Sequence, residues 1–129
     1  MIVVDSNILA YLLLPHEFSV EADALFKRDP EWVAPIIRRS EFRNLLAACA
    51  RRKTLTFDEV LKVQAEAEAL SAGNAHEVDS QRVLELVRDS NCSVYDCEFG
   101  AFAIRAGTKV VTTDGKMLKE SFQYAVVLS

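Results

Sequence analysis

The feature that constrains this chain most is a run of three β-branched residues, Ile2–Val4, that ends in Asp5. The run has no polar alternation, which is typical of a strand buried on both faces of a parallel sheet. Ser6 and Asn7 follow, and the apolar stretch Ile8–Leu14 then resumes at helical spacing. In parallel α/β sheets, ligands bind beyond the carboxyl ends of the strands. Asp5 therefore stands where a ligand would bind.

The length and composition favour one globular domain over residues 1–129. Half of the residues are apolar, 26% are charged and the formal net charge is −4. Such a charge argues against a protein that coats nucleic acid non-specifically, although a local basic patch remains compatible with it.

No segment indicates a membrane or an export signal. The longest apolar run, Ile8–Leu14, is far shorter than the roughly 20 residues of a membrane span. Met1 leads directly into the first strand, so we expect no signal peptide. The three cysteines are odd in number and form no C-x-x-C pair, which indicates reduced thiols in the cytoplasm and argues against a zinc site.

Strand-like and helix-like segments alternate along the rest of the chain. Further strands are expected at 31–35, 75–78, 109–114 and 125–128. Helices are expected at about 20–28, 37–53, 56–70, 81–88, 94–107 and 116–120. This order predicts an α/β fold, with a mostly parallel sheet covered by helices on both sides.

Local signals predict several helix ends and buried faces. Ser19 is expected to cap the second helix, and Thr56 with Glu59 forms a capping box that opens the fourth. Residues 71–74 are expected to end that fourth helix. The predicted buried faces are Val20, Ala24 and Leu25; Ile37, Leu45, Ala48 and Cys49; and Val83, Leu84 and Val87.

Four acidic residues lie in otherwise apolar surroundings: Asp5, Glu41, Asp96 and Asp114. Three of them have simple structural explanations. An aspartate such as Asp5 commonly caps a helix, and Asp96 fits a capping box with Ser93. Asp114 precedes a glycine, which is a common turn pair.

Glu41 is harder to explain structurally, because it lies four residues from both Ile37 and Leu45 on the predicted buried face. Burying an unpaired carboxylate costs several kcal/mol or raises its pKa. An arginine partner is one alternative. Spacing argues against Arg39 and Arg43, which are two residues away and project elsewhere, but a partner from another element stays open.

Taken together, the four acids indicate a metal site. Clustered carboxylates cannot all stay ionised without cations, because like charges raise one another's pKa. Mg²⁺ and Mn²⁺ are hard ions that bind oxygen and relieve this repulsion. Two such ions about 4 Å apart can activate a water and neutralise the leaving oxygen of a phosphodiester.

At these acids the sequence resembles a known family. Segments 4–9, 40–46, 95–99 and 111–114 look like the four signature segments of PIN-domain nucleases. In length and arrangement the whole chain is similar to the single-domain VapC toxins of toxin–antitoxin pairs. The resemblance implies a three-layer α/β/α sandwich, Mg²⁺ or Mn²⁺, and cleavage of single-stranded RNA. It also implies a homodimer and a neutralising antitoxin.

The resemblance further assigns roles to individual residues. The acids at Asp5, Glu41, Asp96 and Asp114 match the catalytic, metal-binding positions of the family. Asn7 and either Thr112 or Thr113 match the polar residues that support the site. Glu98 adds an acid two residues past Asp96. A helix turns it about 200° from that neighbour, which favours a solvent-facing or supporting role.

Basic residues near these segments are candidates for RNA contacts. Arg38, Arg39 and Arg43 flank Glu41, and Lys116 follows Asp114. Each can bind phosphate, although a solvated helix face explains the arginines about as well. The leucines at 12–14 exceed what one helix face can bury and suggest a dimer contact.

Two other classes of protein compete with a nuclease. A phosphatase of the haloacid-dehalogenase kind needs an aspartate pair spaced D-x-D, and Asn7 occupies the second position. Asparagine cannot donate and retake a proton, so this class is excluded. A non-catalytic module whose acids hold a structural metal or receive a basic partner stays open.

Overall fold

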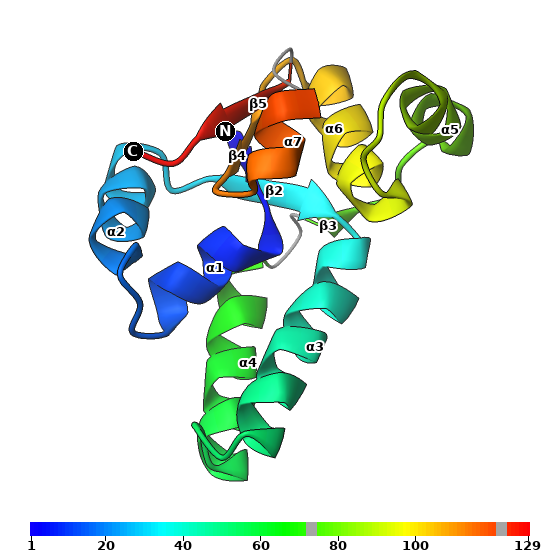
Figure 1. The fold of residues 1–129 in the computed structure, drawn as a ribbon. Helices are drawn as coiled ribbons and strands as arrows, with labels where there is room; N and C mark the ends of the chain where they lie inside the picture. Colours follow the sequence, from blue (N-terminus) through cyan, green and yellow to red (C-terminus); the bar gives the residue numbers. More distant parts are fainter. Residues whose placement is uncertain (72–74, 121–123) are drawn as a thin grey trace.

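The structure is a computed structural model that describes residues 1–71, 75–120 and 124–129 (Figure 1). Within these residues, one sheet of five parallel strands has the order β3-β2-β1-β4-β5. The strands are β1 (Ile2–Val4), β2 (Trp32–Pro35), β3 (Ala75–His76), β4 (Val110–Thr112) and β5 (Ala125–Val127). The helices are α1 (Ser6–Leu13), α2 (Ser19–Arg28), α3 (Ile37–Arg51), α4 (Phe57–Ser71), α5 (Ser80–Asp89), α6 (Val94–Ala106) and α7 (Gly115–Glu120).

Alternate side chains of each central strand enter two different cores. In β1, Val4 packs into a cluster formed with α1, α3 and α4, whereas Val3 packs against α6 and α7. Val111 and Val110 divide in the same way in the neighbouring strand β4. Both faces of the sheet are therefore apolar, which explains the missing polar alternation. The predicted three-layer α/β/α sandwich is confirmed.

The order of the strands sets the position of any site. β1 lies at the centre of the sheet and pairs with β4, with Val4 opposite Val111. Because the strands are parallel, their carboxyl ends lie at one edge of the sheet, from which α1 and α7 begin. The residues that follow these strands, Asp5 and Asp114, are thus brought to the same edge.

Most of the predicted helix ends agree with the structure. The capping box is confirmed, since the Thr56 N–H donates to Glu59 at 2.9 Å and the Glu59 N–H donates to the Thr56 hydroxyl at 3.2 Å. Gly107 ends α6 with a φ of 71°, a conformation that glycine adopts without strain. α4 ends at Ser71. The other residues that were predicted to end this helix, 72–74, lie outside the described residues.

The prediction that Ser19 caps α2 is wrong. Ser19 is the first residue of the helix, and Phe18 occupies the cap position without a side-chain bond. The Ser19 hydroxyl accepts the N–H of His16 at 2.9 Å and lies 2.7 Å from the carbonyl oxygen of Tyr11. It therefore ties the connecting loop to α1 instead of capping α2.

The predicted buried faces were partly wrong, because each helix is rotated slightly from its predicted position. α2 buries Ala22 and Leu25 and exposes Val20. α5 buries Val83 against α6 and exposes Leu84. α3 packs on both α1 and α4 through Phe42 and Leu46. Its fully buried positions are Arg38, Phe42 and Leu46, and the predicted Ile37, Leu45, Ala48 and Cys49 are half-buried.

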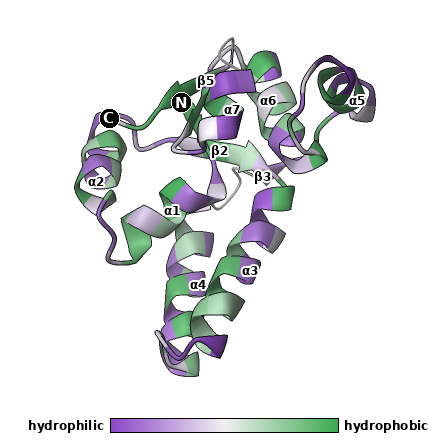
Figure 2. Cartoon of the chain, in the orientation of Figure 1, coloured by the Kyte–Doolittle hydropathy of each residue, from purple (hydrophilic) through white to green (hydrophobic). Residues whose placement is uncertain are grey.

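α3 and α4 extend together away from the sheet as an antiparallel pair (Figure 1). α1 packs against the part of this pair nearest the sheet, through Ile8 and Leu9. α4 carries hydrophobic residues out to its far end (Figure 2). Within the described residues, no helix is long and apolar enough to cross a membrane.

Candidate active site

A cavity of about 190 Å³ lies at the carboxyl edge of the sheet, and all four predicted acids line it. We call it the acidic pocket. The acids come from the end of β1, from α3, from the first turn of α6 and from the loop after β4. The lining residues are Asp5, Ser6, Asn7, Glu41, Asn44, Leu45, Asp96, Phe99 and Asp114.

Asp5 is held by three donors. One oxygen, Oδ1, accepts the N–H groups of Asn7 at 3.0 Å and Ile8 at 3.2 Å, which makes Asp5 the N-cap of α1. The other oxygen accepts the hydroxyl of Thr112, which is fully buried in β4. The hydroxyl of Thr112 also accepts the N–H of Asp114 at 2.9 Å. Thr112 therefore connects the two acids that follow the central strands.

Asp114 caps the short helix α7. Its Oδ1 accepts the N–H of Lys116 at 2.9 Å and that of Met117 at 3.3 Å. Both acids therefore accept backbone N–H groups at the start of a helix, as their structural explanations predict. Capping orients both carboxylates toward the same cavity, so the structural and functional explanations are compatible.

Glu41 has a hydroxyl as its hydrogen-bond partner. Ser6 donates to Glu41 Oε1 at 2.8 Å, and Ser6 is itself buried at the start of α1. Within the described residues no ion pair involves Glu41. The alternative of a buried arginine–glutamate pair therefore finds no support in the structure.

Asp96 lies in the first turn of α6, where its N–H donates to the hydroxyl of the N-cap residue Ser93 at 3.1 Å. Its side chain is half-buried and lines the acidic pocket. Asp96 is thus fixed by its helix. It lines the acidic pocket from the face of the sheet that α6 covers, whereas α3 covers the other face.

The electrostatics of the pocket disfavour ionised acids. Burial raises the pKa of Asp5, and the charge of Asp114 adds to this increase, although hydrogen bonds from Thr112 and the α1 backbone oppose it. Burial likewise raises the pKa of Glu41, with the hydrogen bond from Ser6 opposing it and the charges of Asp96, Asp5 and Glu98 adding to it.

The pKa of Asp96 is raised in the same way, first by burial and then by the charge of Asp114. The hydrogen bond with Ser93 and the positive charge of Lys116 oppose this increase. Three of the four acids are therefore destabilised as anions by burial and by one another, which is the situation that a bound cation relieves.

The donor set suits a hard divalent ion, because it consists of carboxylates with hydroxyl and amide oxygens beside them. As the side chains stand in residues 1–71, 75–120 and 124–129, however, no three acidic, histidine or cysteine residues form a group that could hold an ion. The chemistry of the residues fits Mg²⁺ or Mn²⁺. The carboxylates would have to draw closer together to coordinate it.

The remaining predicted residues lie at varying distances from the acids. Asn7 is exposed and lines the acidic pocket. Of the two threonines, Thr112 contacts Asp5, whereas the hydroxyl of Thr113 lies 3.1 Å from that of Tyr11. Lys116 is exposed at the start of α7 and close enough to act on the pKa of Asp96.

Glu98 is half-buried and is absent from the lining of the acidic pocket. Its charge nevertheless raises the pKa of Glu41, and burial raises the pKa of Glu98 itself. This position fits the predicted supporting role better than that of a ligand.

Four residues that line the acidic pocket were not predicted to belong to the site: Ser6, Asn44, Leu45 and Phe99. Asn44 follows Glu41 by three residues on α3, a spacing that places two helical side chains side by side. Ser6 stands next to Asp5 in the first signature segment. The sequence thus places Ser6 and Asn44 next to predicted acids, but it does not indicate which carboxylate either side chain would contact.

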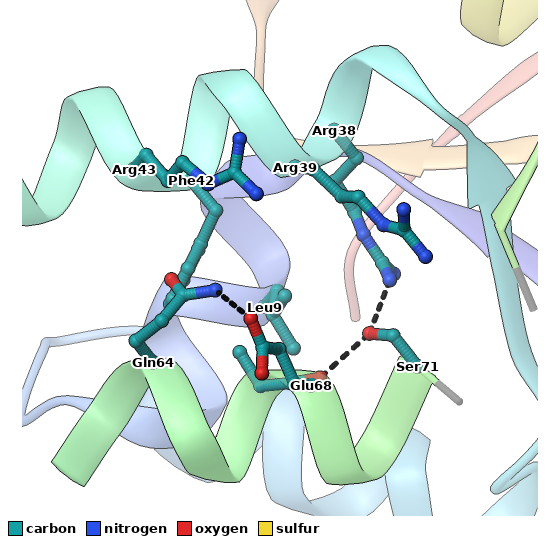
Figure 3. Close-up of a pocket in the computed structure, with 9 residues that line it drawn as sticks. Leu9, Arg38, Arg39, Phe42, Arg43, Gln64, Glu68 and Ser71 are labelled. Carbon is teal, nitrogen blue, oxygen red and sulfur yellow. Dashed lines mark hydrogen bonds between the residues drawn. The ribbon is translucent and has the colours of Figure 1, made fainter. Parts of the chain in front are cut away.

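The three arginines that flank Glu41 in sequence lie elsewhere. Arg38, Arg39 and Arg43 line a second cavity, of about 300 Å³, between α3 and α4 (Figure 3). Their contact with RNA phosphates stays a prediction, and the structure separates them from the pocket of the four acids.

This fold and this arrangement of acids define a class of protein. The chain belongs to the PIN domain family, whose match spans residues 2–121. The fold class and the family resemblance of the four segments are thereby confirmed.

Solved structures with the same fold include proteins from archaea and bacteria. PAE2754 from Pyrobaculum aerophilum has a TM-score of 0.75 at 20% identity, over 98% of this chain and 89% of that one. FitAcB from Neisseria gonorrhoeae has a TM-score of 0.75 at 17% identity, over 100% of this chain and 97% of that one. A chain of a toxin–antitoxin complex from Klebsiella pneumoniae has a TM-score of 0.72 at 16% identity, over 100% of this chain and 98% of that one. None of the curated proteins matches this chain.

Proposed function

We propose that this protein is a Mg²⁺- or Mn²⁺-dependent endoribonuclease that cleaves single-stranded RNA, the toxin of a VapC-type toxin–antitoxin pair. The observation that carries the proposal is the acidic pocket, in which four carboxylates from four elements line one cavity. Membership of the PIN domain family supports nuclease chemistry, and likeness to a toxin–antitoxin complex supports the toxin role.

In this proposal Asp5, Glu41, Asp96 and Asp114 hold the metal. When bound, a divalent ion supplies a water activated for attack on phosphorus and neutralises the leaving oxygen. The protein supplies the orientation of the ligands. Hydrogen bonds of this kind around metal ligands fix carboxylate orientation and tune affinity. They come from Ser6 to Glu41 and from Thr112 to Asp5.

Neutral and basic residues at the pocket would bind the RNA. The amides of Asn7 and Asn44 line the cavity and can donate to phosphate oxygens. Lys116 is exposed beside the acids and would contact a neighbouring phosphate. Through these contacts the chain would hold the scissile phosphate against an otherwise repulsive acidic surface.

The partners in this proposal are an antitoxin and a second copy of the chain, in the cytoplasm. An acidic pocket suits an arginine side chain from an antitoxin segment, because a guanidinium pairs bidentately with a carboxylate and would occupy the metal space. A chain in the structure of FitAB bound to a DNA fragment has the same fold, with 17% identity and a TM-score of 0.72.

The test is cleavage of a mixed pool of single-stranded RNA by the purified protein. We expect cleavage with Mg²⁺ or Mn²⁺, none in EDTA, and loss of cleavage by at least about two orders of magnitude in Asp5→Asn. Asp23→Asn is the matched control, because Asp23 is exposed on α2. Cleavage in EDTA that survives Asp5→Asn would overturn the proposal.

The alternative is a non-catalytic PIN-like module that binds a metal or a basic partner. The acidic pocket is compatible with it too, because four carboxylates around one cavity can hold a structural ion or receive a basic side chain without cleaving RNA. Binding of Mn²⁺ or of a basic peptide at the acidic pocket, with no cleavage of any RNA in the pool, would identify this alternative.

A further inference from the structure

The cavity between α3 and α4, which we call the arginine pocket, holds a buried charge that the proposed nuclease function does not use. It lies beside α1 and is lined by Leu9, Arg38, Arg39, Phe42, Arg43, Gln64, Ala67, Glu68 and Ser71 (Figure 3). Its positive groups come from α3 and its polar groups from α4.

Arg38 is the central residue of this pocket, and only 3% of it is exposed. Its Nη2 donates to the hydroxyl of Ser71, which in turn donates to the carbonyl of Ala67 at 2.7 Å. No carboxylate pairs with Arg38 within the described part of the chain. A guanidinium has five N–H donors and a full charge, so one hydroxyl leaves it short of a counter-charge.

The surrounding charges do not compensate Arg38. Arg39 and Arg43 are exposed at the rim of the pocket and add two positive charges. Burial, with a contribution from Arg39, lowers the pKa of Arg38 to about 10. The lining contains one acid, Glu68, which accepts a hydrogen bond from Gln64 at 3.1 Å. The pocket thus carries a net positive charge in a partly buried place.

An apolar groove continues from the arginine pocket along the same two helices. It is a cavity of about 350 Å³ that shares Arg43 and Gln64 with the arginine pocket. The other residues lining it are Leu46, Ala47, Ala50, Arg51, Phe57, Val60 and Leu61. Phe57 is 69% exposed and Leu61 52%, so large apolar side chains face solvent there.

We propose that the α3–α4 face binds a segment of a partner protein that is both apolar and acidic. The segment places a large apolar side chain in the apolar groove and a carboxylate against Arg38 in the arginine pocket. A carboxylate matches the guanidinium through two parallel hydrogen bonds. The apolar side chain adds burial, as in other helix-groove complexes.

The neighbouring groove favours a protein over RNA as the occupant. A nucleic acid that reached Arg38 could pair with Arg43 and Arg51 in the groove lining. Its charged backbone would, however, also cover the exposed apolar side chains of Phe57 and Leu61. A peptide can present an apolar and an acidic side chain a few residues apart. This inference does not depend on nuclease activity, so its failure and that of the proposed function are distinguishable.

The test uses the full chain, ¹⁵N-labelled and kept in EDTA so that no cleavage occurs. The probes are fluorescein-labelled ten-residue peptides in which a Leu-Phe pair precedes two glutamates by two to six residues. Matched peptides carry glutamine in place of glutamate. We expect at least one glutamate peptide to bind about tenfold or more tightly than its glutamine match, and to shift amide signals along α3 and α4.

Variants locate the binding site. Arg38→Met should remove the tenfold preference for glutamate and leave the affinity for the glutamine peptide unchanged. Leu61→Gln should weaken both peptides by the same factor. Arg105→Met is the matched control, because Arg105 is exposed on α6. If Arg38→Met fails to fold, Arg38→Lys keeps the charge, loses the bidentate geometry and should reduce the same preference.

Three results would overturn the inference. The first is no binding of any peptide at millimolar concentration. The second is equal binding of glutamate and glutamine peptides. The third is a ten-nucleotide oligouridine that shifts the α3 and α4 signals when the peptides do not, which would assign the pocket to RNA.

Discussion

The acidic pocket and the arginine pocket both use α3, yet they hold opposite charges. Glu41 lines the acidic pocket and Arg38 lines the arginine pocket, although the two residues are only three positions apart in the sequence. In both pockets the charged group is hydrogen-bonded to a serine hydroxyl, Ser6 for Glu41 and Ser71 for Arg38. Neither has an ion-pair partner in the described residues.

The difference between the two pockets lies in what would complete them. The acidic pocket gathers four carboxylates, so adding a cation relieves repulsion among several groups at once. The arginine pocket holds one buried cation with two more at its rim, so an anion relieves it. We therefore infer that α3, which carries uncompensated charge on two adjacent faces, contributes to two sites with different ligands, and the following experiments test that contrast.

The largest expected effect is on cleavage. Glu41→Gln should lower cleavage of single-stranded RNA by at least about two orders of magnitude, because it removes a charged carboxylate from the proposed set of metal ligands. Its stability in EDTA should stay level or rise, since the remaining acids repel one another less. Mn²⁺ should raise the melting temperature of the wild type more than that of the variant.

Glu66→Gln is the control for Glu41→Gln, because the same substitution there falls on an exposed position of α4. It should leave both cleavage and the response to Mn²⁺ unchanged. Retained cleavage by Glu41→Gln together with a loss of about 3–5 kcal/mol in EDTA would instead show that Glu41 is part of a buried ion pair.

The next largest effect is expected at Thr112, which connects two acids of the acidic pocket. Thr112→Val removes the donor to Asp5 and the acceptor for the Asp114 N–H. Leaving buried polar groups unpaired costs about 1–3 kcal/mol, measured by urea unfolding in EDTA. Thr112→Ser keeps the hydroxyl and should lose less than half as much; equal losses would show that the methyl packing matters instead.

In the arginine pocket, the expected change in stability is opposite in sign to that of Thr112→Val. Arg38→Met removes a buried charge that lacks a counter-charge and keeps an apolar side chain of similar length. Without a partner protein, stability should rise by about 1 kcal/mol. Chemical denaturation measures this, with Arg105→Met as the neutral reference. A loss above about 2 kcal/mol would mean that Arg38 stabilises the α3–α4 packing.

The smallest effect is a dependence of stability on pH. The pKa values of Asp5, Glu41 and Asp96 are raised in the native state, so the native state keeps its protons longer than the unfolded chain. Stability in EDTA should therefore fall as pH rises from about 4 through these raised values. Urea unfolding at a series of pH values measures the slope.

The same series separates the two pockets. Glu41→Gln should flatten the slope in the acid-to-neutral range, whereas Arg38→Met should not, because the pKa of Arg38 lies at about 10. If Glu41→Gln left the pH dependence of stability unchanged, the carboxylates of the acidic pocket would not repel one another as their geometry implies.

Much of the fold was predictable from the sequence, for a definable reason. The strands after which Asp5 and Asp114 stand are apolar on both faces, and a parallel sheet covered by helices buries such strands on both sides. Once the sheet is parallel, the carboxyl ends converge, so the location of both acids follows.

The burial of Arg38 was not predictable, because it depends on how α3 rotates about its axis. Each residue turns a helix by about 100°, and the sequence offers apolar residues on two adjacent faces. Phe42 and Leu46 pack between α1 and α4, and their position draws the aliphatic stem of Arg38 inside with them. Packing against α1 and α4 therefore determines which of the two apolar faces of α3 is buried.

The bond between Asp5 and Thr112 joins residues from opposite ends of the chain. β1 is made before β4 and can pair with it only when residues 110–112 are available, so the acidic pocket does not exist until those residues have been synthesised. The last of its four acids, Asp114, arrives together with that strand. Under the proposed function, a chain that stops before residue 114 would lack one of the four acids and would therefore be inactive as a nuclease.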